Sequence, residues 1–341
     1  MIAECIQRRP KGFFVNTPAS PFFGEIFLNG GKARLERLAE LVEEPVTPDN
    51  FSLRRPEIED AEILIGTWGF PCELAADLAE LPGLSLVLYA GGSTRGFAGP
   101  FLERNIPVVS AREVNAQVVA EFCHAQIVLA NKGYFRNIRS TRDPRTAHPL
   151  VAACGPGNHG AKVALLGYGA VGRALRKLLR LMSIEVLVVD PTVSSAAAAE
   201  DHIRLVDLEE AFSEALVVSN HLPDFPELKH CLKDLHFAAM REGATFINTG
   251  RGAQVDEAGL LKTLRARPDL TALLDVTFPE PPEAGSGIYT LPNVLLSSHI
   301  AGVVGKEREL LVTTIAEDLE RHLAGRPLLH AIDKAAWELM A

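Results

Sequence analysis

Helical and strand-like patterns of apolar residues alternate along the first 130 residues of the chain. Continuous apolar runs predict buried strands, at residues 62–68, 84–90 and 106–110. Apolar residues at helical spacing predict helices, over residues 33–42, 71–81 and 112–132. Because strands that alternate with helices are typical of a parallel sheet with helical crossovers, we expect an α/β architecture here. The first 30 residues show no pattern that predicts an element.

A proline-rich, polar stretch at residues 139–160 breaks this alternation, and a second series of elements follows it. Apolar runs predict six strands in this series, starting at Lys162, Glu185, Leu216, Ala244, Thr271 and Val294. Helical spacing predicts helices over residues 170–182 and 207–215, and a last helix over residues 304–323. Six strands joined mostly by helices are typical of a doubly wound sheet.

The length of 341 residues indicates two domains, at roughly 150 residues per domain. The 47% of hydrophobic and 23% of charged residues are typical of a globular protein rather than a disordered or fibrous one. The 34 basic and 43 acidic side chains give a net charge of −9. Since such a chain has no general positive field, the composition argues against nucleic acid as a partner.

Five cysteines lie far apart, without a CxxC pair or a histidine at metal-ligand spacing: Cys5, Cys72, Cys123, Cys154 and Cys231. This usage predicts reduced thiols in a cytoplasmic protein, with no bound metal. The N-terminus places Glu4 and a basic pair where a signal peptide needs an apolar run. No stretch of about 18 uncharged apolar residues occurs, so we expect no export and no membrane span.

Three glycines follow the first strand of the second series, in the sequence GYGAVG. The first suits a tight strand-to-helix turn, the second lets a pyrophosphate approach the backbone, and the third lets the helix pack on the strand. The N-terminus of the next helix then offers free N–H groups to the phosphates. We expect this whole loop to contact a dinucleotide: Gly167, Tyr168, Gly169, Ala170, Val171 and Gly172. The alternative is a glycine-rich turn that binds nothing.

Asp190 ends the next predicted strand, 18 residues after Gly172. A carboxylate at this place accepts hydrogen bonds from both ribose hydroxyls and repels a 2′-phosphate. No arginine follows to offset that repulsion, because the next residues are Pro191, Thr192 and Val193. The sequence therefore predicts NAD rather than NADP as the cofactor.

Three polar segments follow strands of the same domain: INTGRG with Arg251, DVTFPEPP with Asp275 and Glu280, and SSHIAG with His299. Taken singly, each residue could be an ordinary surface or structural side chain. Together with GYGAVGRAL they resemble the D-isomer-specific 2-hydroxyacid dehydrogenase family, whose signature is an Arg, a Glu and a His in this order behind such a fingerprint. The resemblance covers most of residues 116–302.

This resemblance implies two Rossmann-like α/β domains with doubly wound parallel sheets. A discontinuous, flavodoxin-like substrate domain would take residues 1–111 and 303–341, and an inserted NAD-binding domain would take residues 112–302. It also implies an NAD-dependent enzyme that interconverts a 2-oxo acid and a D-2-hydroxy acid, and a homodimer as the assembly.

The chemistry explains the residue types. Hydride transfer to C2 of a 2-oxo acid leaves an alkoxide, which must be protonated as it forms. His299 is the expected acid, and the Glu280 carboxylate would stabilise its imidazolium and determine its tautomer. Arg251 would hold the substrate carboxylate and polarise the carbonyl with one planar guanidinium.

The resemblance implies further contacts. Asp275 would face the nicotinamide amide, and the rest of the cofactor groove would be lined by His221, Leu222, Pro223, Thr249 and Ala301. The backbone N–H groups of Gly91 and Gly92 would help to hold the substrate carboxylate. Arg95 stands where many relatives have an acidic residue, so the substrate cannot be transferred from them.

Arg95 could reach a polar or anionic substrate tail, or it could be a solvated arginine at a loop tip. A second function is open as well. A binding protein that senses NADH, as certain transcriptional corepressors resembling this family do, could retain the same residues. A formate dehydrogenase would carry an amide partner for the histidine, and Glu280 argues against it.

Overall fold

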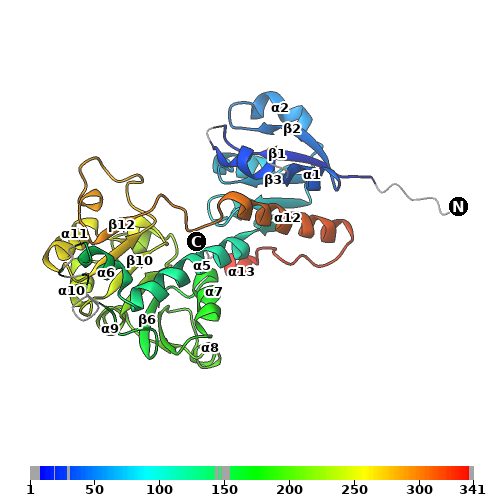
Figure 1. Ribbon diagram of the computed structural model, residues 1–341. Helices are drawn as coiled ribbons and strands as arrows, with labels where there is room; N and C mark the ends of the chain where they lie inside the picture. The colour runs from blue at the N-terminus through cyan, green and yellow to red at the C-terminus, as the bar shows by residue number, and fades with distance from the viewer. Residues whose placement is uncertain are drawn as a thin grey trace. The chain divides into compact units, whose positions relative to one another are not determined.

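The computed structural model describes residues 8–18, 20–28, 31–142, 145, 147 and 154–337 (Figure 1). It divides into two compact units, one of residues 1–115 with 303–341 and one of residues 116–302. The division falls inside helix α5 (Arg112–Asn131), which is the longest helix of the described chain. Part of the proline-rich stretch between the two series of elements lies outside the described residues.

The first unit contains a five-stranded parallel sheet in the order β2-β1-β3-β4-β5. The strands are β1 (Lys11–Val15), β2 (Glu40–Val46), β3 (Ile63–Thr67), β4 (Leu86–Ala90) and β5 (Val108–Ser110). Its helices are α1 (Gly31–Glu36), α2 (Phe51–Ile58), α3 (Ala75–Ala79), α4 (Ala98–Glu103), α12 (Arg308–Leu323) and α13 (Lys334–Trp337). This strand order is the flavodoxin-like one, so the predicted fold class of this part is confirmed.

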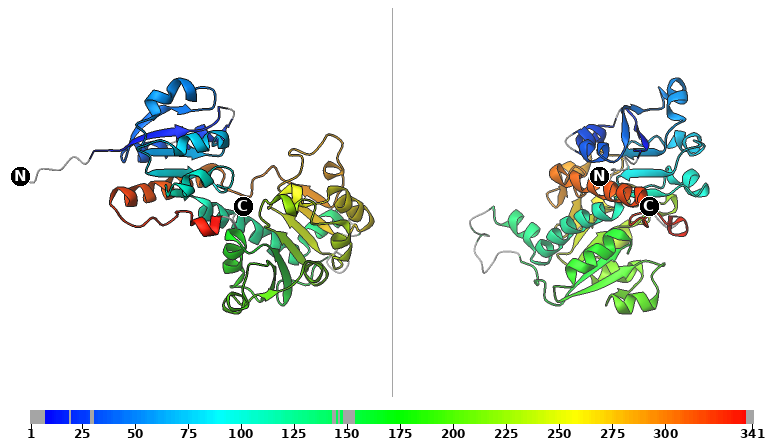
Figure 2. Two further views of the ribbon diagram at one scale, coloured as in Figure 1. Left: turned by 180° about the vertical axis from the view of Figure 1, so that it is seen from behind. Right: turned by 90° about the vertical axis from the view of Figure 1, so that its right-hand side faces the viewer.

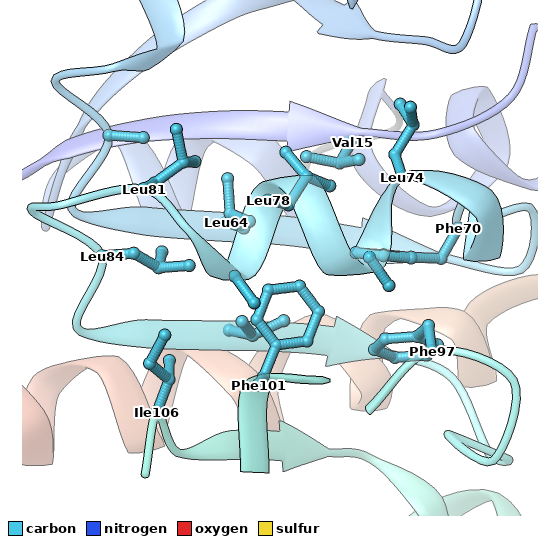
Figure 3. Packing of buried hydrophobic residues seen from close by; sticks show 14 of the residues in the cluster. Val15, Leu64, Phe70, Leu74, Leu78, Leu81, Leu84, Phe97, Phe101 and Ile106 are labelled. Atoms are coloured by element: carbon cyan, nitrogen blue, oxygen red, sulfur yellow. The ribbon is translucent and has the colours of Figure 1, made fainter. Parts of the chain in front are cut away.

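One hydrophobic core of the first unit lies between a face of the sheet and the helices that cover it. Leu78 from α3 and Phe101 from α4 pack beside Val15 of β1 and Leu64 of β3 (Figure 3). All four side chains are fully buried. Burying one such side chain contributes about 1.5–3 kcal/mol, so these contacts hold the helices on the sheet.

Helix α12 returns to the first unit from the far end of the chain and runs along the sheet next to β4 and β5 (Figure 2). Its Asp318 is completely buried and accepts three hydrogen bonds, from Leu329 N at 2.6 Å, His330 N at 3.0 Å and His330 Nδ1 at 2.7 Å. The segment around His330, which Asp318 holds, extends the edge of the sheet, since Ser110 N donates to His330 O. Asp318 therefore ties the last segment to the edge strand β5, which would otherwise be open.

Replacing Asp318 with Ala is expected to lower the free energy of unfolding by about 2–4 kcal/mol, because three donors lose their buried acceptor. Urea denaturation of the whole protein measures the change. Glu317→Ala is the matched control, since Glu317 is exposed on the same helix and such a site changes stability by about 0.5 kcal/mol or less. Equal stability of the two variants would contradict the role of Asp318.

The second unit contains a seven-stranded parallel sheet in the order β12-β11-β10-β9-β6-β7-β8. The strands are β6 (Ala161–Leu166), β7 (Ile184–Val189), β8 (Arg204–Leu205), β9 (Val217–Asn220), β10 (Thr245–Asn248), β11 (Thr271–Leu274) and β12 (Val294–Leu296). Its helices are the greater part of α5, then α6 (Tyr134–Ser140), α7 (Ala170–Leu179), α8 (Ser195–Glu200), α9 (Leu208–Glu214), α10 (Asp234–Ala239) and α11 (Glu257–Ala266). The strand order is that of a Rossmann fold with one added strand, and it reverses between β6 and β9. The predicted doubly wound sheet is confirmed.

The prediction of one helix over residues 33–42 is wrong. Helix α1 ends at Glu36, and Glu40–Val46 forms β2, whose Glu40 pairs in parallel with Lys11 of β1. β2 is the edge strand of its sheet and contains Pro45, which an edge strand tolerates. Because its residues are half-exposed and rich in charge, β2 contains no continuous apolar run from which a strand could be predicted.

Several short elements escaped the sequence analysis. The interior strand β1 was not predicted, nor were α2, α4, α6 and α13. The two-residue strand β8 carries too little apolar sequence to give a signal. The predicted helix over residues 170–182 ends three residues early, at Leu179.

Candidate active site

The glycine loop lies where the strand order of the second unit reverses. Gly167 has a φ of +89°, and a Cβ there would lie 2.6 Å from the carbonyl oxygen of His221. A Cβ at Gly172 would lie 2.5 Å from the carbonyl oxygen of Gly167. A Cβ at Gly169, in contrast, would meet no atom of the described chain within 4 Å. The fold itself thus requires the first and third glycines, while the second faces open space that suits a phosphate group.

Asp190 stands beside this loop at the end of β7. Its Oδ2 accepts a hydrogen bond from Tyr168 N at 2.7 Å, and its Oδ1 accepts from Thr192 N at 2.9 Å and Thr192 Oγ1 at 2.7 Å. The half-buried carboxylate is therefore held in place by both neighbouring loops.

The side chain of Tyr168 is committed to packing within the unit. Its hydroxyl donates to Asp201 Oδ2 at 2.9 Å, and the Arg173 guanidinium lies over its ring, 4.9 Å from the centroid. Burial and the Asp201 carboxylate raise the pKa of the Tyr168 phenol. What Tyr168 brings to the site is its backbone N–H, which positions Asp190.

His221 opens the loop after β9 and joins a hydrogen-bonded chain of side chains. Its Nε2 lies 2.9 Å from Ser219 Oγ and its Nδ1 lies 3.3 Å from Thr249 Oγ1, which in turn lies 3.3 Å from Cys123 Sγ. Burial lowers the pKa of His221 to about 4 and raises that of the Cys123 thiol to about 12. The His221 imidazole is therefore a neutral, structural part of this loop. Neither Cys123 nor Ser219 belongs to a motif, so the sequence did not indicate either of them as a site residue.

Asp275 follows β11 and is only 3% exposed. Its carboxylate accepts hydrogen bonds from Ser297 Oγ at 2.6 Å and from the backbone N–H groups of Ile300 and Ala301, both at 2.9 Å. Its carbonyl oxygen accepts from His299 N, also at 2.9 Å. Asp275 therefore positions the segment that carries His299, and its contact with a nicotinamide amide stays a prediction.

His299 and Glu280 come together from two different loops. The Nδ1 of His299 lies 2.8 Å from Glu280 Oε1, and the two side chains are 54% and 42% exposed. His299 has a φ of +57°, a conformation held by its backbone contact with Asp275. Because Nδ1 faces the carboxylate, Nε2 is the nitrogen that can act on a ligand.

Arg251 follows β10, and its guanidinium has a partner that the sequence analysis did not foresee. Its Nε donates to Asp224 Oδ2 at 3.1 Å and its Nη1 donates to Gly250 O at 2.9 Å. The next residue must be glycine, since a Cβ at Gly252 would lie 2.0 Å from the carbonyl carbon of Thr277. A guanidinium has five N–H donors, so the edge between Nη1 and Nη2 can still bind a carboxylate.

Ala170 and Val171 begin helix α7, and Leu222 and Pro223 follow His221 in the loop after β9. The other predicted substrate-binding residues belong to the first unit. Gly91 and Gly92 follow β4, and both of their carbonyl oxygens accept a hydrogen bond from Ser110 Oγ, at 3.0 and 2.9 Å. A Cβ at Gly91 would lie 2.7 Å from the Tyr89 ring, so the turn requires glycine there. Arg95 is exposed on the same loop.

Residues 129–301, about half of the chain, match the family model of the D-isomer specific 2-hydroxyacid dehydrogenase NAD binding domain. The chain belongs to the D-isomer-specific 2-hydroxyacid dehydrogenase family. The resemblance drawn from the motifs is therefore confirmed, and the second unit contains an NAD-binding domain.

Relatives in this family are named after several different substrates. The chain is 28% identical over 231 residues to a D-3-phosphoglycerate dehydrogenase of Archaeoglobus fulgidus, which covers 68% of this chain and 44% of that enzyme. It is 30% identical over 170 residues to a glycerate dehydrogenase of Methylorubrum extorquens, which covers 49% and 52%. This chain thus spans about half the length of both dehydrogenases.

The two-unit fold recurs in solved structures. The holo form of D-mandelate dehydrogenase from Rhodotorula graminis superposes with a TM-score of 0.75 at 23% identity, covering 96% of this chain and 98% of that one. No helix in the described part of the chain has the length and apolar character needed to cross a membrane.

Proposed function

We propose that this family member is an NAD-dependent oxidoreductase that interconverts a 2-oxo acid and a D-2-hydroxy acid. One observation carries the proposal. The His299–Glu280 pair, with its 2.8 Å contact, and Arg251 all follow the carboxyl ends of strands in the unit that holds the dinucleotide loop. Ligands of doubly wound sheets bind at this edge.

The residues of the crevice suit the cofactor. The open space at Gly169 and the start of α7 would receive the pyrophosphate, and Asp190 would hold the adenosine ribose. The groove beyond would be lined by His221, Leu222, Pro223, Thr249, Asp275 and Ala301. Bound there, the nicotinamide supplies or accepts the hydride.

His299 would act as the acid in the reduction direction. A proton on Nε2 passes to the substrate oxygen as C2 receives the hydride, and the Glu280 carboxylate on Nδ1 stabilises the imidazolium that donates it. In the oxidation direction the neutral imidazole takes the proton back. Both side chains of this pair are exposed in large part, so a substrate can reach them.

Arg251 would hold the substrate carboxylate on its Nη1–Nη2 edge. Asp224 and the Gly250 carbonyl accept hydrogen bonds from the guanidinium, so the orientation of its plane is fixed before substrate binds.

A panel of 2-oxo acids tests this function. We expect NADH absorbance to fall when a 2-oxo acid is added to the protein, and the product to be the D-2-hydroxy acid. The His299→Asn variant is the control. NADH binding without any turnover across the panel would overturn the enzyme and favour the alternative, a protein that senses NADH.

The preference for NADH over NADPH is expected to depend on Asp190. Asp190→Ala should reduce the ratio of kcat/KM for NADH to that for NADPH by about tenfold or more, because it removes hydrogen bonds to a charged acceptor worth about 1.5–3 kcal/mol. Steady-state kinetics with both cofactors measure the ratio. Glu200→Ala removes an exposed carboxylate from nearby α8 and should leave the ratio unchanged. Equal use of both cofactors by the unmodified protein would contradict the assignment.

A further inference from the structure

Three buried amide side chains link the loop after β9 to the loop after β10, and none of them is a predicted site residue. Asn220 ends β9, Asn248 ends β10, and Gln254 lies in the loop that follows β10. The strand register places Asn220 and Asn248 next to each other. The three residues are 0%, 1% and 2% exposed, in that order. Because buried polar groups need hydrogen-bond partners, the contacts of these amides determine how the two loops pack.

Gln254 uses all four of its hydrogen-bonding positions within the chain. Its Nε2 donates to Leu222 O at 3.1 Å and to Pro223 O at 2.7 Å, both in the loop after β9. Its Oε1 accepts from Asn220 Nδ2 at 2.7 Å and from Arg251 N at 3.3 Å. A side-chain amide has two N–H donors and one oxygen with two lone pairs. Gln254 therefore has no position left for a ligand.

The two asparagines complete this amide network. Asn220 Nδ2 also donates to Asn248 Oδ1 at 2.9 Å, and Asn220 Oδ1 accepts from Leu222 N at 3.3 Å. Asn248 Oδ1 accepts from Gly250 N at 3.1 Å, and Asn248 Nδ2 donates to Arg251 O at 3.3 Å. A Cβ at Gly250 would lie 3.0 Å from Asn220 Nδ2, so the close approach of the amides favours glycine there.

Arg251 is thereby held at its backbone as well as at its guanidinium. Its N–H donates to Gln254 and its carbonyl oxygen accepts from Asn248, while Asp224 of the other loop accepts from Nε. The Asp224 side chain is 58% exposed and borders a cavity of about 320 Å³, so close packing does not hold its carboxylate. The place of this ion pair therefore depends on the backbone of the loop after β9, which Gln254 binds at the carbonyl of Pro223.

We propose, building on the proposed function, that Gln254 is a positioning residue that holds the Arg251 guanidinium in the orientation that binds the substrate carboxylate. It acts through the backbone of Arg251 and through the loop that carries Asp224, without touching the substrate. An apolar side chain in its place would leave the Arg251 N–H and two carbonyl oxygens without partners, so the two loops would have to rearrange.

Gln254→Met tests this role, because it keeps the length of the side chain and removes its hydrogen bonds. At saturating NADH, kcat/KM for pyruvate should fall by about 10- to 10²-fold, mainly through a higher KM, since a displaced guanidinium binds the carboxylate less well. Asn293→Leu is the matched control. Asn293 is also 2% exposed, and its Nδ2 donates to Leu264 O and Arg267 O at the amino edge of the sheet. This control should lower stability but retain the native kcat/KM.

A double-mutant cycle separates positioning from a general loss of structure. If Gln254 acts through Arg251, adding Gln254→Met to Arg251→Leu should change kcat/KM by less than about twofold. Equal losses in the native and the Arg251→Leu backgrounds would overturn the role. Gln254→Glu is a second variant of the same size, which keeps the acceptor for Arg251 N but lacks the two donors when it is ionised. It should also weaken kcat/KM, and native values in both Gln254 variants would overturn the proposal.

Calorimetric binding of oxamate in the presence of NADH distinguishes this proposal from the proposed function. Oxamate has the carboxylate of a 2-oxo acid, but an amide replaces the reactive ketone. A Kd about tenfold weaker in Gln254→Met than in Asn293→Leu supports the role of Gln254 whether or not the protein reduces any 2-oxo acid. Equal Kd values in these two variants would overturn it, even if the native protein proves to be a dehydrogenase.

Discussion

Replacing His299 with Asn is expected to lower kcat for reduction by about 10²- to 10⁴-fold, the usual contribution of a positioned proton donor. Asparagine cannot donate a transferable proton from the position of Nε2, while the open space at Gly169 and the Asp190 carboxylate are unchanged. NADH should therefore bind with its native Kd, which fluorescence titration measures alongside the steady-state kcat. A variant that retains native kcat would exclude His299 as the acid.

Glu280 acts through His299 and gives this assignment a second readout. Glu280→Gln removes the carboxylate that lies 2.8 Å from Nδ1 and that orients the imidazole for proton transfer, so kcat for reduction should fall, though less than in His299→Asn, while the Kd for NADH stays native. A native kcat in Glu280→Gln would contradict the coupling of the two residues.

Replacing Arg251 with Leu is expected to lower kcat/KM for the 2-oxo acid by about 10²- to 10³-fold. The substrate carboxylate loses its bidentate hydrogen bonds, and the Asp224 carboxylate, 3.1 Å from Nε in the native protein, is left unpaired where it repels the substrate. Because a charge of the wrong sign remains, the loss should exceed that of the neutralising double variant Arg251→Leu/Asp224→Leu. Steady-state kinetics on the two variants and the native enzyme measure both effects.

Arg251→Lys is the conservative control. Lysine keeps a positive charge but cannot bind Asp224 and a substrate carboxylate with one rigid plane, so it should recover only part of the lost kcat/KM. A loss in Arg251→Leu that appears as weaker NADH binding, with unchanged KM for the 2-oxo acid, would place Arg251 in the cofactor site instead.

Much of the second unit could be predicted from the sequence, because its signals are local. The strands β6, β7, β10 and β11 are mostly buried and rich in apolar residues, and the glycines of the loop after β6 follow the spacing of a known motif. The order of Arg251, Glu280 and His299 followed from motifs that each span a few residues. Such motifs can be recognised without knowing which other residues contact them in the folded protein.

The elements that were missed lack such local signals. β2 is a half-exposed edge strand, which forms because β1 offers it a pairing partner, and β1 itself is recognised only through the sheet around it. The two-residue strand β8 exists because β7 lies next to it. These segments are stabilised as strands by pairing with another part of the chain. Their own residues therefore could not predict that they form strands.

The sequence by itself determined the fold class, the family, the dinucleotide loop and the identity of the expected acid, base partner and guanidinium. The tertiary structure decided what surrounds them. It pairs Arg251 with Asp224 and links Ser219 through His221 and Thr249 to Cys123 by side-chain contacts. It also lets Asp275 position the segment of His299, and it leaves a cavity beside Phe278. These partners lie on several loops, on strand β9 and on helix α5, which are far apart in the sequence. Their contacts therefore depend on strand order and loop packing, which no motif of a few residues encodes.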